Sequence, residues 1–279
     1  MGRFSWLEIA PAEAEQTAPS LPATLASDGS SFAAQALTEA NKLLTEGLYS
    51  QALRQYSRAI DEDKDNLEAW LGQTLCQLAL DEKEQAAVWA KHMRERFPNE
   101  PEADCAWHLT QSALGHAPEE IASWLQRQDA PDSPALPPFC AYAQAVCLFN
   151  QNQAEAGQSA LASLLQKLST RTEQMRWVLL VADFLLHRRL ADGTCALLEA
   201  LYEAQELNTF GLSMWIKAEW LRGDGNRAQL LLDAMRQRDA AAVTVYGVDD
   251  YMKEETPAVL PGIKQYLMNW INRFSRDKD

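Results

Sequence analysis

Apolar residues recur at every third or fourth position along most of the chain, and this period predicts amphipathic helices. The clearest case is the segment 43–98, where Gly47 is followed by Ala52, Tyr56 and Ala59. Small and aromatic residues therefore alternate on one face of the expected helix. Because a small residue lets two helices approach and a ring fills the remaining gap, we expect this face to pack against a neighbouring helix.

The same pattern returns 34 residues later, since Ala86 follows Ala52 and Ala90 follows Tyr56 at that interval. Pro98 cannot continue a helix and closes this second unit. A 34-residue period with two helices per unit is typical of the tetratricopeptide repeat, and the segment resembles that family. The resemblance is clear over about residues 33–100, weaker as far as residue 128, and returns near residues 208–238.

The sequence also departs from the family pattern. Gln73, Thr74 and Gln77 stand where the family usually has leucine, a small residue and tyrosine. Asp81 replaces the turn glycine of the second unit, and Lys64 replaces the closing proline of the first. None of these changes alters the helical period.

The periodic segments predict an all-α fold: a right-handed superhelical solenoid of about six helical pairs plus a C-terminal capping helix. The pairs are expected at residues 32–46 and 51–61, 67–80 and 84–97, 101–114 and 118–128, 139–150 and 154–168, 170–188 and 192–205, and 210–221 and 227–238. Asp192 is expected to cap its helix. Residues 243–250 are rich in β-branched side chains and are expected not to be helical.

A final helix over residues 256–275 is expected to carry one apolar face, formed by Ile263, Leu267, Trp270, Ile271 and Phe274. We interpret it as a cap over the end of the solenoid. The alternative is that this face docks a partner helix.

Composition shifts divide the chain into four parts. Residues 1–31 read as a disordered segment with a short aromatic motif, and residues 32–128 as the tetratricopeptide-like repeats. Residues 129–138 contain four prolines and are expected to form a bend. Residues 139–279 read as degenerate helical pairs with the cap.

The aromatic motif at the amino terminus consists of Phe4, Trp6, Leu7 and Ile9, followed by a tether rich in Ala, Pro, Glu, Ser and Thr. Segments of this kind dock into a partner's pocket through their large apolar side chains. We therefore predict a docking motif. Two other interpretations stay open: the segment folds into the chain's own groove, or it is merely tolerated.

The net charge of the chain and the length of its apolar segments limit the classes of partner that it can bind. The chain has 279 residues and a net charge of −14, so it lacks the basic stripe expected of nonspecific nucleic-acid binding. Its apolar runs are too short to cross a bilayer, and no membrane insertion is expected. Five scattered cysteines fit a reducing compartment, and we expect a cytoplasmic protein with the thiols in its core.

A search for catalytic and metal-binding motifs predicts no catalytic residue, cofactor or metal ion. The phosphate-loop, metalloprotease and nucleophile-elbow spacings do not occur. Cys105 and His108 lie three residues apart with His116 beyond, but this spacing is not one of the usual zinc patterns. The acidic turn at residues 61–65 lacks the glycine and glutamate of a calcium loop.

The resemblance implies binding, because first helices of successive repeats line a concave groove that receives a peptide or helix. By phase, that groove is formed by Leu37, Asn41, Leu44, Leu71, Leu75, Leu78 and Leu109. Since only Asn41 suits a carboxylate clamp, an apolar protein ligand is expected. We predict a noncatalytic scaffold or adaptor in complex assembly, of unknown oligomeric state. The alternatives are a permanent subunit of a larger machine, such as a secretion machine, and, less favoured, an enzyme.

Overall fold

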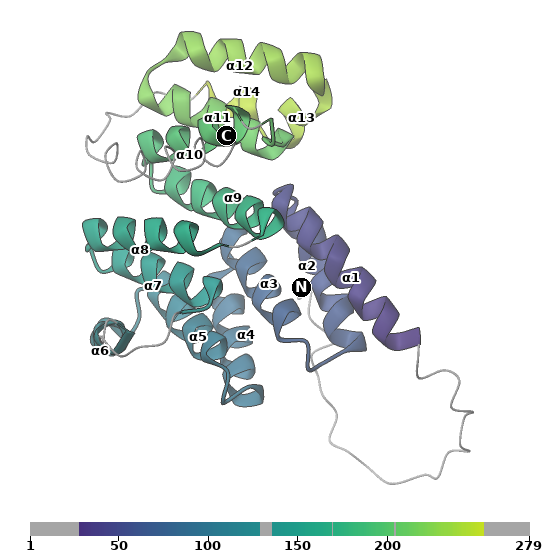
Figure 1. Cartoon of the computed structure of the whole chain (residues 1–279), viewed down its shortest axis with the longest axis vertical. Helices are drawn as coiled ribbons and strands as arrows, with labels where there is room; N and C mark the ends of the chain where they lie inside the picture. The colour runs from purple at the N-terminus through teal and green to yellow at the C-terminus, as the bar shows by residue number, and fades with distance from the viewer. Residues whose placement is uncertain (1–27, 129–135, 169, 204, 254–279) are drawn as a thin grey trace, which may run out of the picture.

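A computed structural model describes residues 28–128, 136–168, 170–203 and 205–253, and the predictions for the amino-terminal motif and the terminal helix lie outside these ranges (Figure 1). Within them the fold is all-α, an array of helical pairs without a strand. The helices are α1 (Asp28–Thr45), α2 (Tyr49–Glu62), α3 (Leu67–Ala79), α4 (Lys83–Arg96), α5 (Pro101–Ala113), α6 (Pro118–Gln128), α7 (Pro138–Asn150), α8 (Ala154–Lys167), α9 (Arg171–His187), α10 (Ala191–Glu203), α11 (Thr209–Arg222), α12 (Gly225–Arg238), α13 (Ala240–Val245) and α14 (Val248–Tyr251).

One turn geometry joins the two helices of every pair. A residue with φ between 59° and 85° ends the first helix and reverses the chain. A hydrogen bond spanning five residues accompanies it, as from Asp224 N to Glu219 O at 3.0 Å, and satisfies a carbonyl of the last helical turn. These six turn residues are Gly47, Asp81, Gly115, Asn152, Arg189 and Gly223. The turn therefore recurs from α1 to α12, at intervals of 34 or 37 residues.

Small residues bring the helices of the first pairs together, as the sequence pattern predicts. Ala52 and Ala86 have no exposed surface. The ring of Tyr56 covers Gly72 so closely that a Cβ at Gly72 would stand 2.2 Å from it. The Tyr56 hydroxyl donates to Asn41 Oδ1 at 2.7 Å, so the aromatic side chain that fills the gap also has its polar end satisfied.

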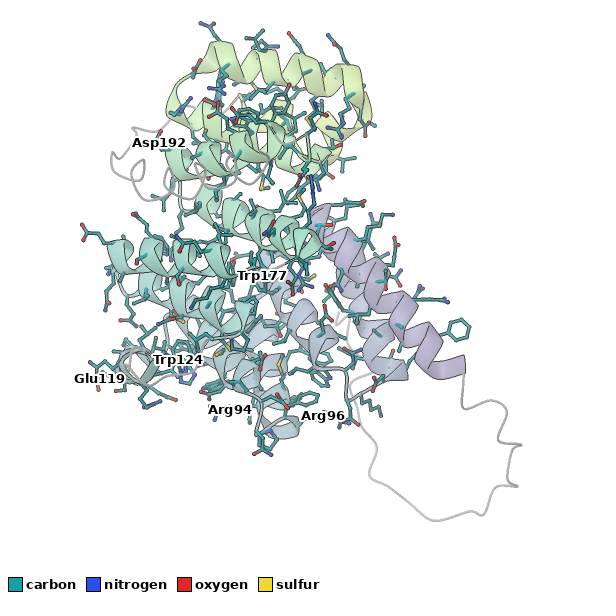
Figure 2. All side chains as sticks on the ribbon, in the orientation of Figure 1. Arg94, Arg96, Glu119, Trp124, Trp177 and Asp192 are labelled. Carbon is teal, nitrogen blue, oxygen red and sulfur yellow. The ribbon has the colours of Figure 1, made fainter. Side chains whose placement is uncertain are left out.

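The third pair is packed differently from its neighbours. Helix α5 packs mainly against α4 and α7, and α6 meets it over a smaller surface. Trp124 of α6 is buried and stacks on the His108 ring of α5, with centroids 4.7 Å apart (Figure 2). The segment that begins at α7 therefore continues the array directly from α5, while α6 lies to one side (Figure 1).

The array bends back on itself, so that the first pair contacts the last two. Helix α9 lies against α1, and α11 follows above it (Figure 1). Asn208 Nδ2 donates to Thr45 O at 2.8 Å, and Tyr246 Oη donates to Glu46 O at 2.8 Å. Between these bonds the Phe210 ring covers Gly47, leaving no room for a Cβ. We call this contact between residues 45–49 and the last pairs the closure.

Two predictions about the carboxy-terminal part are wrong. Residues 243–250 are largely helical, in α13 and α14, because Asp239 caps the first helix through the N–H groups of Ala241 and Ala242. Burial of Val243 and Val248 then outweighs their β preference. Asp192 is not a cap: α10 begins one residue earlier, and the carboxylate lies 3.9 Å from Arg222.

Candidate functional site

Four inner helices surround a cavity of about 650 Å³, which we call the larger inner cavity. Helices α3, α5, α7 and α9 each contribute apolar side chains to its wall. Its mouth lies where these helices end, between the turn after α3 and the turn after α9. Its lining includes Leu75, Leu78, Leu109, Val146, Leu180 and Asp183.

A second hollow of about 140 Å³, the smaller inner cavity, lies at the opposite ends of the same helices. Trp177 reaches into this region from α9, toward the middle of the molecule (Figure 2). Arg176 donates to Glu68 Oε1 at 2.9 Å and faces Asn41 Oδ1 at 3.4 Å. These bonds tie α9 to α1 and α3 and close this side of the array.

Asp183 is the acidic side chain deepest in the larger inner cavity. Its side chain is 13% exposed, and its Oδ2 accepts a hydrogen bond from the Tyr49 hydroxyl at 2.7 Å. His187 Nδ1 lies 3.4 Å from Oδ1 but is already 2.8 Å from the main-chain oxygen of Asp183. Burial raises the pKa of the Asp183 carboxyl above its usual range, although His187, Tyr49 and Lys217 act in the opposite direction.

A third hollow of about 340 Å³ lies on the other side of Asp183, against α11. Its wall includes Phe210, Met214 and Lys217. Burial lowers the pKa of the Lys217 ammonium group, which donates to Tyr246 O at 2.7 Å. Lys217 is thus already engaged by the main chain near the closure.

The structure distributes the predicted groove residues over both inner cavities. Asn41, Leu44 and Leu71 line the smaller one, Leu78 and Leu109 line the larger one, and Leu75 lines both. Leu37 lines neither and packs half-buried against the core. Leu44, Leu75 and Leu109 are themselves buried, so the surface they offer is limited to the cavity walls.

The 34-residue spacing of the repeats did not show that α7 and α9 of the same chain form the wall of the larger inner cavity opposite α3 and α5. Tyr142 of α7 and Asp183 of α9 face α3 and α5 across the larger inner cavity. The residues that depart from the family pattern, such as Gln73 and Gln77, do not indicate that α7 and α9 lie opposite α3 and α5. One sequence signal was available: Asp183 interrupts an apolar helical segment, since Val181, Ala182 and Leu185 around it are buried.

The thiols and the buried histidine do not assemble a reactive centre in the described part of the chain. All five cysteines are buried, and burial raises the pKa of the Cys147 thiol to about 12. His108 Nδ1 lies 2.9 Å from Asp104 O and its ring stacks on Trp124. Among the described residues there is no group of three or more His, Cys, Asp or Glu side chains able to hold a metal ion.

None of the helices in the described ranges combines the length and the apolar character that crossing a bilayer requires.

The helical array, its repeated turn and its inner surface define an α-solenoid of the repeat class. Residues 43–106 match the family model of the tetratricopeptide repeat, so this region consists of tetratricopeptide repeats. The match covers α2, α3 and α4 and parts of α1 and α5, which are the helices with the small and aromatic pattern. Comparisons with curated proteins and with solved structures returned no match.

Proposed function

We propose that this protein is a noncatalytic scaffold that binds a segment of a partner protein in the larger inner cavity. Tetratricopeptide repeats generally mediate protein–protein interaction. The observation that carries the proposal is the cavity of about 650 Å³ with apolar walls from four helices. That volume lies within the range of ligand-binding pockets and suits a few apolar side chains of an inserted segment.

A charge placed in the cavity wall tests this proposal. Leu78→Glu changes a half-buried residue that lines the cavity, and we expect it to abolish capture of the partner from a native lysate. Val88→Glu is the matched control, because Val88 is 55% exposed on α4 and lines neither inner cavity. Equal capture by both variants would refute the cavity as the binding site.

The amino-terminal motif of Phe4, Trp6, Leu7 and Ile9 remains part of the proposal as a second docking element. Deletion of residues 1–10 separates the interpretations. Loss of partner binding with unchanged thermal stability supports a docking motif, and a lower melting temperature supports insertion into the chain's own cavity. If neither property changes, the motif is dispensable.

A permanent place in a larger assembly is the second candidate, favoured by exposed apolar side chains spread over several helices. Phe32, Val88, Tyr202, Leu230 and Val245 are each more than half exposed. An obligate subunit would cover them. Size-exclusion chromatography of the chain alone distinguishes the two: a monomeric, well-behaved chain supports the scaffold, and aggregation supports the subunit. We also propose a cytoplasmic location, which microscopy of a tagged chain tests.

A further inference from the structure

We infer that the segment received by the larger inner cavity carries a basic side chain, lysine or arginine, between apolar residues, and that Asp183 selects it. This inference rests on the proposed function and specifies its ligand. Three features support it: an incompletely matched carboxylate in the cavity, apolar walls beside that carboxylate, and the charge of the whole chain.

The carboxylate of Asp183 has unused capacity as an acceptor. A carboxylate can accept about four hydrogen bonds, yet among the described residues only the Tyr49 hydroxyl donates one to Asp183. Lys217 contributes a favourable field but is held by Tyr246 O. His187 stands 3.4 Å away with a side chain 68% exposed to water. Asp183 is therefore a buried carboxyl group that no lysine or arginine of the described residues pairs with, and its nearest basic neighbour is the exposed His187 imidazole.

The remaining charged groups at this cavity are engaged with one another or with neutral partners. Lys83 pairs with Asp81 at 2.7 Å at the mouth. Arg188 donates to Asn150 Oδ1 and lies 5.6 Å from the centre of the Phe184 ring. Among the described residues neither Lys83 nor Arg188 forms an ion pair with Asp183.

The walls beside Asp183 suit the aliphatic stem of a basic side chain. Leu75 and Leu78 of α3 face Leu180 of α9 across the cavity. Lysine and arginine bury their methylene groups along such surfaces while the charged head reaches a polar site. A neutral apolar residue would fill the same walls but leave the carboxylate unmatched, and an acidic residue would be repelled.

The net charge of the chain acts in the same direction at longer range. With 39 acidic and 25 basic residues, the molecule carries −14 at neutral pH. A field of this sign increases the encounter rate with basic segments and decreases it with acidic ones. Long-range attraction and the local anion at Asp183 thus favour the same class of ligand.

Two matched pools of fluorescent heptapeptides test the inference on the full chain. Both contain random Leu, Val, Ile, Phe and Ser, and they differ only at the central position, which is lysine in one pool and norleucine in the other. Fluorescence polarisation is expected to show at least about tenfold tighter binding of the lysine pool, the size of one hydrogen bond to a charged group. Asp183→Asn is expected to abolish that preference without lowering the melting temperature.

The matched control is Asp233→Asn, which makes the same change of charge on α12, at a side chain 53% exposed and outside the cavity. It is expected to keep the preference. Equal binding of both pools to the unaltered chain, or a preference that survives in Asp183→Asn, would overturn the inference and leave the cavity as a peptide site. If neither pool binds, the proposed function fails as well, so the two failures are distinguishable.

Discussion

The first two helical pairs and the last two have the same architecture but are held together by different chemistry. In α1 to α4, small residues at helix crossings and the Tyr56 ring over Gly72 bring the helices together. In α9 to α12, the carboxylate of Glu219 is 1% exposed and is bound by Trp215, Arg222 and Arg227. In the last pairs a buried carboxylate with two partly exposed arginines is therefore added to small buried residues such as Ala228.

This difference explains where the family model matches. The small and aromatic pattern is a property of side chains, and the match ends at residue 106, in α5. The turn that reverses each pair is a property of the backbone, and it continues through Asn152, Arg189 and Gly223. The turn geometry of the repeat is thus preserved beyond the region that the family model matches.

The largest effect is expected from overpacking a crossing in the first pairs. Ala52→Trp inserts a ring where no surface is exposed, and should lower the free energy of unfolding by about 3 kcal/mol, the upper end for overpacked cores. Ala228→Trp makes the same change in α12, also without exposed surface. If the crossing is common to both regions, denaturant titrations should give similar losses. A loss confined to Ala52→Trp would show that only the first pairs depend on it.

The closure is tested by two glycines with the same backbone conformation. Gly115 has φ +71° and no heavy atom within 4 Å of a built Cβ, so Gly115→Ala should cost about 1 kcal/mol, from the left-handed conformation alone. Gly47 has φ +67°, but its Cβ would stand 2.4 Å from the Phe210 ring. Gly47→Ala should therefore cost about 2 kcal/mol or more, with overpacking added. Equal losses in thermal unfolding would mean that the closure does not form.

The ionic cluster of the last pairs is tested by Glu219→Ala. This change leaves the Trp215 indole N–H without its acceptor at 2.9 Å and removes a partner of two arginines. Unfolding should become easier by about 2 kcal/mol, limited by the access of both arginines to water. Asp233→Ala, at an exposed ion pair of α12, is the control and should change stability by less than about 0.5 kcal/mol. If Glu219→Ala lowered the free energy of unfolding no more than Asp233→Ala does, the structural role of the ionic cluster would be contradicted.

The smallest expected effect is a gain in stability at a turn. Arg189 has φ +59°, a conformation in which a branched or long side chain is strained. Arg189→Gly should raise the free energy of unfolding by up to about 1 kcal/mol. Asn152→Gly, at φ +60°, should gain less, because asparagine tolerates this region. A melting temperature that falls in Arg189→Gly would show that its side chain contributes more than the turn costs.

The sequence predicted the all-α fold, whereas the contacts that shape the inner cavities could not be predicted from it, for a physical reason. Helix periods and turn residues are local signals, and α6, for example, begins and ends where proline and its apolar face indicated. The contact between Asp183 and Tyr49 joins residues 134 positions apart. No local pattern contains such a contact, so Leu75 could be placed on an inner surface but the helix facing it could not be identified. The same limit applied at Val243 and Val248, where capping and burial outweighed local preference.

The closure also determines how late in its synthesis the chain can complete its fold. Tyr246 donates to the oxygen of Glu46 across 200 positions, whereas a linear array relies mainly on neighbouring repeats. At about 5–20 residues per second on the ribosome, roughly 10–40 s pass between the appearance of these two partners. During that interval the contacts of the turn at residues 45–49 form in stages, first with Asp183 of α9, then with Asn208 and Phe210, and last with Tyr246. Completion of the closure must therefore await Tyr246 at the end of α13, and a nascent chain stalled before α9 would leave Gly47 and Tyr49 without the contacts that cover them.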